Sequence, residues 1–346
     1  MKKILLVGLA IISAVATAQD IHFSQLAHTP LYLSPAAAGA SPADFRVSLH
    51  ERSQWKSIGS PYQTFGVALD GKLSKKSWRT RHFGVGLVLF NDKARSLKVN
   101  RFQGDLQLAF HQKLSLNSYL SAGILVGISQ NSMDFSGAQW DNQYDGTGFN
   151  SSLSSGEVAV YKPFINVDAA AGLMYSYGTG AKTISSHNSK SFQIGASAYH
   201  LSKPKLSFYS TPKESYYMRF VVHGNGLFGI NNTSWAVRPA FVYERKGKEQ
   251  ELVFGSLFRY QIKEKSHYTG FVNQFDFSFG AYYRCWSDAI IPMVYLDLAN
   301  FGLGVSYDIN VSKLATASRF RGGVEISLKF VTPNPYKPAT SSFPSM

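Results

Sequence analysis

The side chains in this sequence that could carry out catalysis or bind a metal are not spaced as in known sites. We find no G-x-S-x-G nucleophile elbow, no H-E-x-x-H zinc motif and no P-loop. Cys285 is the only cysteine, which excludes an intramolecular disulfide and a cysteine-based zinc site. We therefore predict no catalytic residues, no metal and no cofactor. Nine histidines are scattered without metal-ligand spacing, at His22, His28, His50, His82, His111, His187, His200, His223 and His267.

The stretch D-N-Q-Y-D-G, residues 141–146, is similar to the beginning of a calcium-binding loop. Such a loop needs oxygen ligands at alternate positions and a bidentate glutamate at the twelfth. Gln143 occupies a ligand position here, and Ser152 stands where the glutamate should be. We interpret this stretch, with Trp140 and Tyr144, as an outer loop that folds over the mouth of the protein or meets a partner.

The amino terminus predicts export from the cytoplasm. Lys2 and Lys3 precede an apolar run from Ile4 to Ala16, and the small-residue site A-T-A follows at residues 16–18. The run is too short to cross a bilayer of ~30 Å as a helix. We predict a signal peptide over residues 1–18, a β-barrel over residues 19–330 and a flexible, proline-rich tail over residues 331–346.

Hydrophobicity alternates with a period of two along several segments of about ten residues, which is the length a tilted membrane strand needs. Leu106, Leu108 and Phe110 oppose Asp105 and Gln107, for example. The composition of 45% hydrophobic, 14% aromatic and only 16% charged residues also suits barrel walls. We therefore predict an all-β fold, a transmembrane antiparallel barrel, and favour it over a soluble β-sandwich.

We count about fourteen such segments, with an uncertainty of about two. Their centres lie near residues 47, 67, 87, 106, 124, 171, 197, 221, 239, 257, 280, 292, 305 and 326. An even count predicts that both termini face the periplasm and that the long connection from Gln130 to Pro163 faces outward. Glycine pairs inside strands, such as Gly84 with Gly86 and Gly302 with Gly304, are interpreted as relieving crowding where the wall bends.

The formal charge is +14, or +12 once Lys2 and Lys3 leave with the signal peptide. Nucleic acid is not expected as a partner, because the signal peptide predicts an exported protein. Two basic clusters are open to two interpretations: each binds a partner, or each is only solvated. The outer cluster suits lipopolysaccharide phosphates and the inner one an acidic partner. The outer cluster is Lys93, Arg95, Lys98 and Arg101, and the inner one is Lys72, Lys75, Lys76, Arg79 and Arg81.

Several stretches, in order along the chain, resemble the PorP/SprF family of type IX secretion system membrane proteins. They are residues 19–25 (Q-D-I-H-F-S-Q) with Ser34-Pro35-Ala36 and Gly39, Arg52–Trp55 with Tyr62–Thr64, Ile194–Ser197 with His200-Leu201 and Pro204, Leu257–Tyr260, Tyr283-Arg284, and Ser306–Asn310 through Arg321–Leu328. Ser34 departs from the family, which usually has Asn before the Pro-Ala pair. The resemblance covers nearly the whole mature chain.

The resemblance implies an outer-membrane protein that works with other type IX secretion components and with a large secreted, adhesin-like client, including clients used in gliding. We hypothesise that the barrel is an adaptor and not the conduit, because fourteen strands enclose a modest lumen that loops and inward side chains can fill. A transport barrel for small hydrophobic or polar solutes and a barrel enzyme stay open as alternatives. An adaptor predicts a plugged lumen, a transporter a channel or ligand pocket, and an enzyme clustered polar groups at one rim.

The sequence also nominates residues for a structured outer hairpin and for docking. Asp308 and Asn310 are suited to capping a turn, and Arg321 is placed to pair with Asp308 across the hairpin. An equally open interpretation is that this group only directs folding of the last hairpin. The nominated residues are Asp308, Asn310, Ser318, Arg321, Gly322, Trp55 and Trp140.

Overall fold

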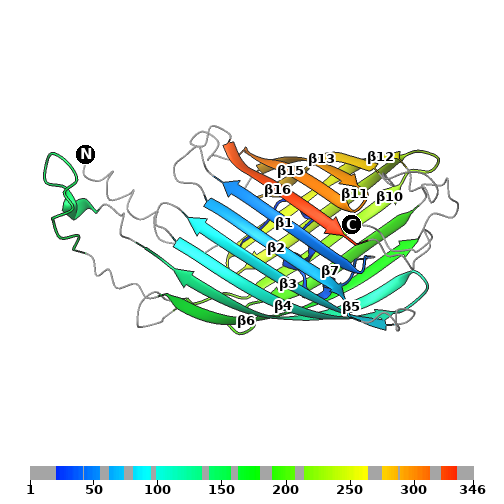
Figure 1. Ribbon diagram of the computed structural model, residues 1–346, viewed down its shortest axis with the longest axis horizontal. Coiled ribbons are helices and arrows are strands. Elements are labelled where there is room, and N and C mark those ends of the chain that lie inside the picture. Colours follow the sequence, from blue (N-terminus) through cyan, green and yellow to red (C-terminus); the bar gives the residue numbers. More distant parts are fainter. Residues whose placement is uncertain are drawn as a thin grey trace.

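The computed structural model shows a closed barrel of fourteen antiparallel strands (Figure 1). It describes residues 21–41, 43–54, 62–73, 81–94, 99–134, 140–156, 163–179, 189–206, 214–263, 275–286, 289–311 and 321–332. The predicted signal peptide and most of the predicted tail lie outside these residues. The barrel strands are β1 (Phe45–Gln54), β2 (Tyr62–Lys72), β3 (Arg81–Ala94), β4 (Val99–Lys113), β5 (Ser118–Ser132), β6 (Phe164–Thr179), β7 (Lys190–Tyr199), β10 (Arg219–Gly229), β11 (Trp235–Lys246), β12 (Glu249–Lys263), β13 (Phe275–Cys285), β14 (Ala289–Leu298), β15 (Phe301–Asn310) and β16 (Arg321–Val331).

The predicted strands are confirmed, since each of the fourteen predicted centres falls inside one of the observed strands. Each strand pairs with its sequence neighbour in the barrel, and β1 closes the ring against β16, with Arg46 opposite Val331. The alternation sets the two faces of the wall. On β4, Leu106 is 59% exposed on the outside while Gln107 is 1% exposed on the inside. The barrel therefore turns an apolar surface outward and polar side chains inward, as a membrane strand requires.

The two ends of the barrel differ in their connections. We call the end where β1 begins and β16 finishes the turn end; tight turns such as residues 114–117 and 299–300 lie there. The opposite end, which we call the loop end, carries the long connection between β5 and β6 and the small hairpin of β8 (Lys205–Leu206) and β9 (Glu214–Ser215). No helix among the described residues is long and apolar enough to cross a membrane.

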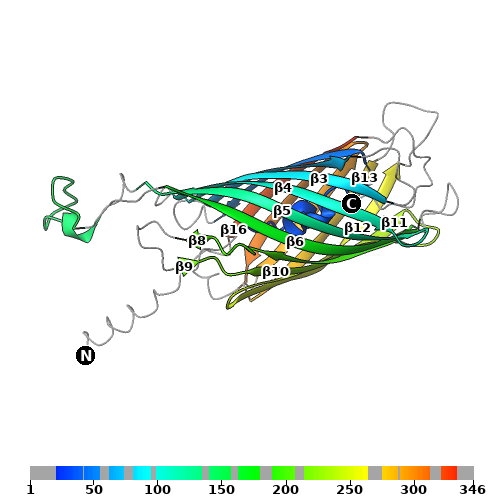
Figure 2. The ribbon, with the colours of Figure 1, turned by 90° about the horizontal axis from the view of Figure 1, so that it is seen from below.

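An N-terminal segment, described over residues 21–41 and 43–44, runs through the lumen before β1 begins (Figure 2). We call residues 21–41 the plug. It contains the short helix α2 (Pro30–Leu33) and the 3₁₀ turn η1 (Pro35–Ala37), in which Ala36 and Ala37 are fully buried. Pro30 and Pro35 each stand at the first turn of their helix, where a missing N–H has no cost.

The path of the plug corrects the prediction for the amino terminus. His22 contacts Arg52, which lies near the loop end of β1, whereas Gly39 contacts Asp70 near the turn end of β2. The described chain therefore starts near the loop end and crosses to the turn end before the first strand. An even strand count places only the start of β1 and the finish of β16 at one end; it does not place the segment before them.

Candidate functional site

A buried cluster of charged side chains lies inside the barrel near the loop end. Arg52 on β1 and Arg284 on β13 each place a guanidinium nitrogen 2.8 Å from Asp308 Oδ2 on β15. Glu325 on β16 lies 3.9 Å from Arg52, and Glu251 on β12 lies 3.5 Å from Arg284. Arg284, Asp308 and Glu325 are each at most 5% exposed. Burial of so many charges is tolerated because each carboxylate has an ion-pair partner.

The plug is bound to this cluster by its own polar groups. The Ser24 backbone N–H donates to Glu325 Oε2 at 2.7 Å, and the Ser24 hydroxyl donates to Asp308 Oδ1 at 2.9 Å. Gln25 donates its backbone N–H to Glu325 Oε1 at 3.1 Å and its side-chain amide to the Glu325 carbonyl at 2.9 Å. Arg52 also donates to the His22 carbonyl. The cluster therefore fixes residues 22–25 against β1, β15 and β16, and charge-assisted hydrogen bonds of this kind are the strong ones.

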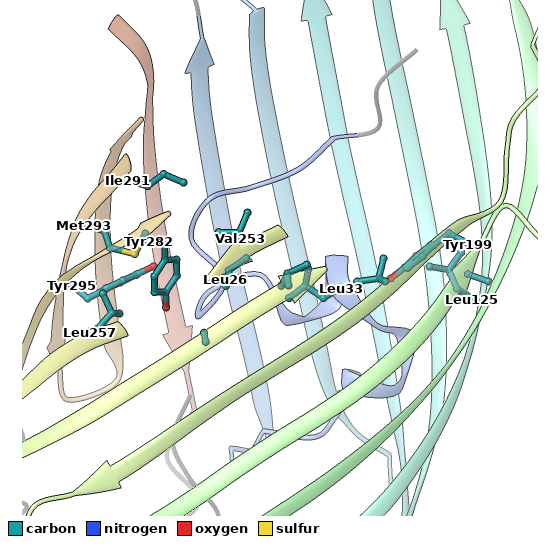
Figure 3. Close-up of a cluster of buried hydrophobic side chains, with 14 residues drawn as sticks. Leu26, Leu33, Leu125, Tyr199, Val253, Leu257, Tyr282, Ile291, Met293 and Tyr295 are labelled. Carbon is teal, nitrogen blue, oxygen red and sulfur yellow. The ribbon is translucent and has the colours of Figure 1, made fainter. Parts of the chain in front are cut away.

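The middle of the plug is held by apolar packing and by glycines in the wall. Leu26 and Leu33 belong to a buried cluster with lumen-facing side chains of β5, β12 and β14, as Figure 3 shows. A Cβ at Gly123 on β5 would lie 2.5 Å from Pro35, and one at Gly84 on β3 would overlap the Ala38 carbonyl. These glycines let the wall approach the plug backbone closely, so the interpretation that Gly84 relieves a bend in the wall is corrected.

At the turn end the plug is held by a second polar group. The Gly39 N–H donates to Asp70 Oδ2 at 2.8 Å, and Arg46 Nε donates to Asp70 Oδ1 at 2.7 Å. His111 Nε2 lies 2.8 Å from the Ala38 carbonyl, with the His82 ring stacked on His111. The plug is thus bound at both ends and packed in its middle.

Little space remains beside the plug. One pocket of about 40 Å³ lies between the plug and the side chains of Arg101, Asp105 and Arg219, and another of about 10 Å³ lies next to Phe23 and Glu251. Spaces of this size hold water molecules and nothing larger. Around these two pockets, the plug and the inward side chains of the described residues therefore fill the lumen. Our expectation that loops and inward side chains fill it was incomplete, because a separate N-terminal segment does most of the filling.

The connection between β7 and β10 lies over the loop end. Tyr216 is 5% exposed and lies between two cations, with the Arg101 guanidinium 5.3 Å and the Lys246 ammonium 5.1 Å from its ring centroid. His200, in the same connection, places Nδ1 2.6 Å from Asp168 Oδ2. Arg101, which the sequence placed in an outer basic cluster, instead donates to Gln103 Oε1 at 2.6 Å. Of that cluster, Lys93 is exposed, while residues 95–98 lie outside the described residues.

The long connection after β5 contains a small folded unit, residues 140–156, which we call the knob. The Trp140 backbone N–H donates to Gln143 Oε1 at 3.3 Å, and the Asn150 N–H donates to the Gln143 carbonyl at 2.7 Å. Asp145 Oδ1 accepts from the N–H groups of Thr147 and Gly148, each at 3.0 Å, and these bonds lower the pKa of Asp145 to about 2. The knob is drawn in green beyond the strand ends in Figure 1.

The nominated site residues have different positions in the structure. Asp308 lies within β15 and points into the buried charge cluster, so it does not cap a turn; its carboxylate binds Arg52, Arg284 and Ser24. A Cβ at Gly322 would lie 2.9 Å from Asn310 Oδ1, which supports a role in packing the last hairpin. Trp140 belongs to the knob. Trp55, Ser318 and the side chain of Arg321 lie outside the described residues, so the predicted pair with Arg321 stays a prediction.

Sequence reasoning missed the residues that hold the plug. The sequence did contain a signal for these residues. The separated stretches that carry the family resemblance contain Ser24, Gln25, Arg52, Asp308 and Glu325. Arg284 is part of another such stretch. The hydrophobic periodicity could not predict that these stretches meet in one place, because their meeting depends on the register of the closed barrel. Among the described residues, no group of three or more His, Cys, Asp or Glu side chains is arranged to hold a metal.

Comparisons with known proteins match one family model and several solved structures. The family model described as type IX secretion system membrane protein PorP/SprF matches residues 15–330. No curated protein matches the chain. The solved structures that match include BamA from Haemophilus ducreyi lacking POTRA domains 1–3, at 8% identity and a TM-score of 0.43 over 83% of this chain and 70% of that chain. The CymD monoaromatic hydrocarbon channel matches at 10% identity and a TM-score of 0.45, over 92% of this chain and 95% of that chain.

Proposed function

Because this chain belongs to the PorP/SprF family of type IX secretion system membrane proteins, we propose that it supports secretion or surface display of large adhesin-like proteins, including gliding-related ones, by binding them. The chain is an outer-membrane β-barrel with a secretion-related role. Its family implies interaction with other components of the secretion system. The proposal adds the client class and the mode of action.

The filled lumen is the observation that carries the binding role. A conduit for a protein needs a wide passage, whereas the described lumen holds a segment bound at both ends, with pockets of about 40 Å³ and 10 Å³ beside it. The contacts to Asp308, Glu325 and Asp70 are buried, so they are not screened by solvent as surface ion pairs are. A barrel closed in this way is suited to act through its surfaces, with other components supplying the passage.

We assign the loop end to the cell exterior and the turn end to the periplasm. Long connections of membrane barrels face outward and tight turns face the periplasm. The 31-residue connection 133–163 lies at the loop end, whereas the turn 299–300 lies at the turn end. On this assignment a client at the cell surface meets the knob and the β7–β10 connection. An exposed cation such as Lys93 then faces the lipopolysaccharide phosphates.

The test compares secreted and surface proteins between the parent strain, a clean deletion of this gene and the complemented deletion. The proposal predicts that one or a few large proteins bearing type IX carboxyl-terminal domains disappear from the surface of the deletion strain and return on complementation. An unchanged protein profile, with altered uptake of or sensitivity to a small solute, would contradict the proposal and favour the transport barrel.

A further inference from the structure

The knob exposes large apolar side chains on a unit that is already ordered. Tyr144 is 61% exposed, Phe149 45% and Leu153 39%, all within a stretch of fourteen residues starting at Trp140. Tyr144 and Phe149 also lie opposite one another, because their backbones form an isolated antiparallel bridge. Exposed aromatic residues that lie opposite one another are typical of protein interfaces.

The patch is held in place without help from a partner. Asn142 Nδ2 donates to the Ser155 carbonyl at 3.2 Å, and Gln143 Nε2 donates to the Leu153 carbonyl at 3.1 Å, so the two arms of the knob are tied together. The Tyr144 hydroxyl donates to the Gly146 carbonyl at 3.0 Å, which fixes the direction of the exposed ring. A preordered surface of this kind loses little conformational entropy on binding.

The charge of the knob identifies the chemistry of its partner. Residues 140–156 contain two charged side chains, Asp141 and Asp145, and no Lys, Arg or His. The knob is therefore anionic in a chain whose formal net charge is +14. Anionic lipopolysaccharide phosphates repel such a surface, whereas a cationic protein surface attracts it.

We propose that the knob is the client-docking surface of this protein, and that it binds a folded client domain through a basic patch bordering an apolar recess. Tyr144 and Phe149 fill the recess, and Asp141 faces the basic patch. Asp145 is a positioning residue, because its carboxylate is used by the turn that holds the two aromatic residues. This inference rests on the proposed function, since it names the surface through which the client is bound.

The test uses the client that the deletion strain loses, purified as the whole exported protein, and the full-length barrel in detergent. The variant Tyr144→Ser/Phe149→Ser removes the apolar contacts, and Asp141→Lys reverses the charge while leaving the hydrogen bonds of Gln143 and Asp145 in place. Leu116→Ser is the matched control, because Leu116 is 81% exposed in the turn 114–117 at the opposite end of the barrel. Barrel folding is checked for each variant by its electrophoretic mobility before and after heating.

We expect the double variant to weaken client binding at least about tenfold, which is the loss typical when an interface anchor is truncated. Asp141→Lys should weaken it severalfold at low salt and less at high salt, because salt screens the charge. Leu116→Ser should bind as the parent does. Client binding at the parent affinity by both knob variants would overturn the docking surface while leaving the proposed function standing. A deletion strain that loses no exported protein would overturn both.

Discussion

At the scale of single residues, Arg52 connects the wall of the barrel to the plug. It binds Asp308 at 2.8 Å, lies 3.9 Å from Glu325 and donates to the His22 carbonyl. The three groups come from β15, β16 and the plug, which are separate in sequence. Removing one member of a buried ion-pair network leaves the others with uncompensated charge, and this costs more than the pair contributes.

Arg52→Met should lower the free energy of unfolding by about 3 kcal/mol or more, the range found when one partner of a buried ion pair is removed. The measurement is urea unfolding of the barrel reconstituted in lipid vesicles. Lys248→Met is the matched control, because Lys248 is an exposed cation in the turn between β11 and β12 and should change stability by less than about 0.5 kcal/mol. Equal effects of the two variants would contradict the role of Arg52.

The plug should bind less tightly at acidic pH. Burial lowers the pKa of His22 from 6.5 to about 4 and lowers the pKa of His28 well below its ordinary value, so both are neutral when the plug is bound. A released plug would take up protons below pH ~6.5. The contribution of the two neutral histidines to plug binding is therefore full above this pH and is progressively lost as the pH falls towards 4.

Hydrogen exchange of residues 21–41, followed from pH 7 to pH 4 with correction for the intrinsic rates, measures this effect. Protection should fall through that interval in the parent and stay flatter in the His22→Asn/His28→Asn variant. Protection in the parent that does not change with pH would show that the two histidines are not linked to plug binding.

At the scale of elements, the fit between the plug and the wall depends on small residues in the strands. The plug passes Gly84 on β3 and Gly123 on β5 at distances that leave no room for a side chain. Strands tolerate such glycines at a cost in stability, which is acceptable where another backbone must approach. The wall and the plug are therefore complementary in shape, so the plug is an integral part of the folded barrel.

Gly123→Val should displace the plug around Pro35 and Ala36, because the added Cβ would lie 2.5 Å from Pro35. Overpacking costs about 1–3 kcal/mol, so hydrogen exchange of residues 36–38 should become about 5- to 150-fold faster. Gly148→Val is the control, since no atom lies within 4 Å of a Cβ at that position. A variant at Gly123 that keeps the parent exchange rates would contradict the close fit.

The strands could be predicted from the sequence, but the plug could not. In strands that separate lipid from lumen, hydrophobicity alternates with a period of two. This alternation is visible in neighbouring residues such as Leu106 and Gln107. Residues 21–41 have no such period, because their partners lie on strands from all around the ring. Asp308 was misplaced for the same reason: Asp near a strand end suits a turn, and only the closed barrel brings Arg52 and Arg284 to it.

At the scale of the whole molecule, the barrel combines a closed lumen with ordered segments at the loop end, namely the β7–β10 connection and the knob. Tyr216 fixes the β7–β10 connection between Arg101 and Lys246. The knob extends beyond the strand ends and is held by its own hydrogen bonds. These features support the proposal that the protein acts in secretion by binding its client.

If the plug closes the barrel, the purified full-length protein should not conduct, and its conductance can be measured in a planar lipid bilayer. We expect the parent to give no sustained channel wide enough for a polypeptide, and a variant lacking residues 21–41 to conduct if its barrel still assembles. Sustained conductance by the parent, with polymers of protein-like width entering the pore, would contradict the account and make the barrel itself the conduit.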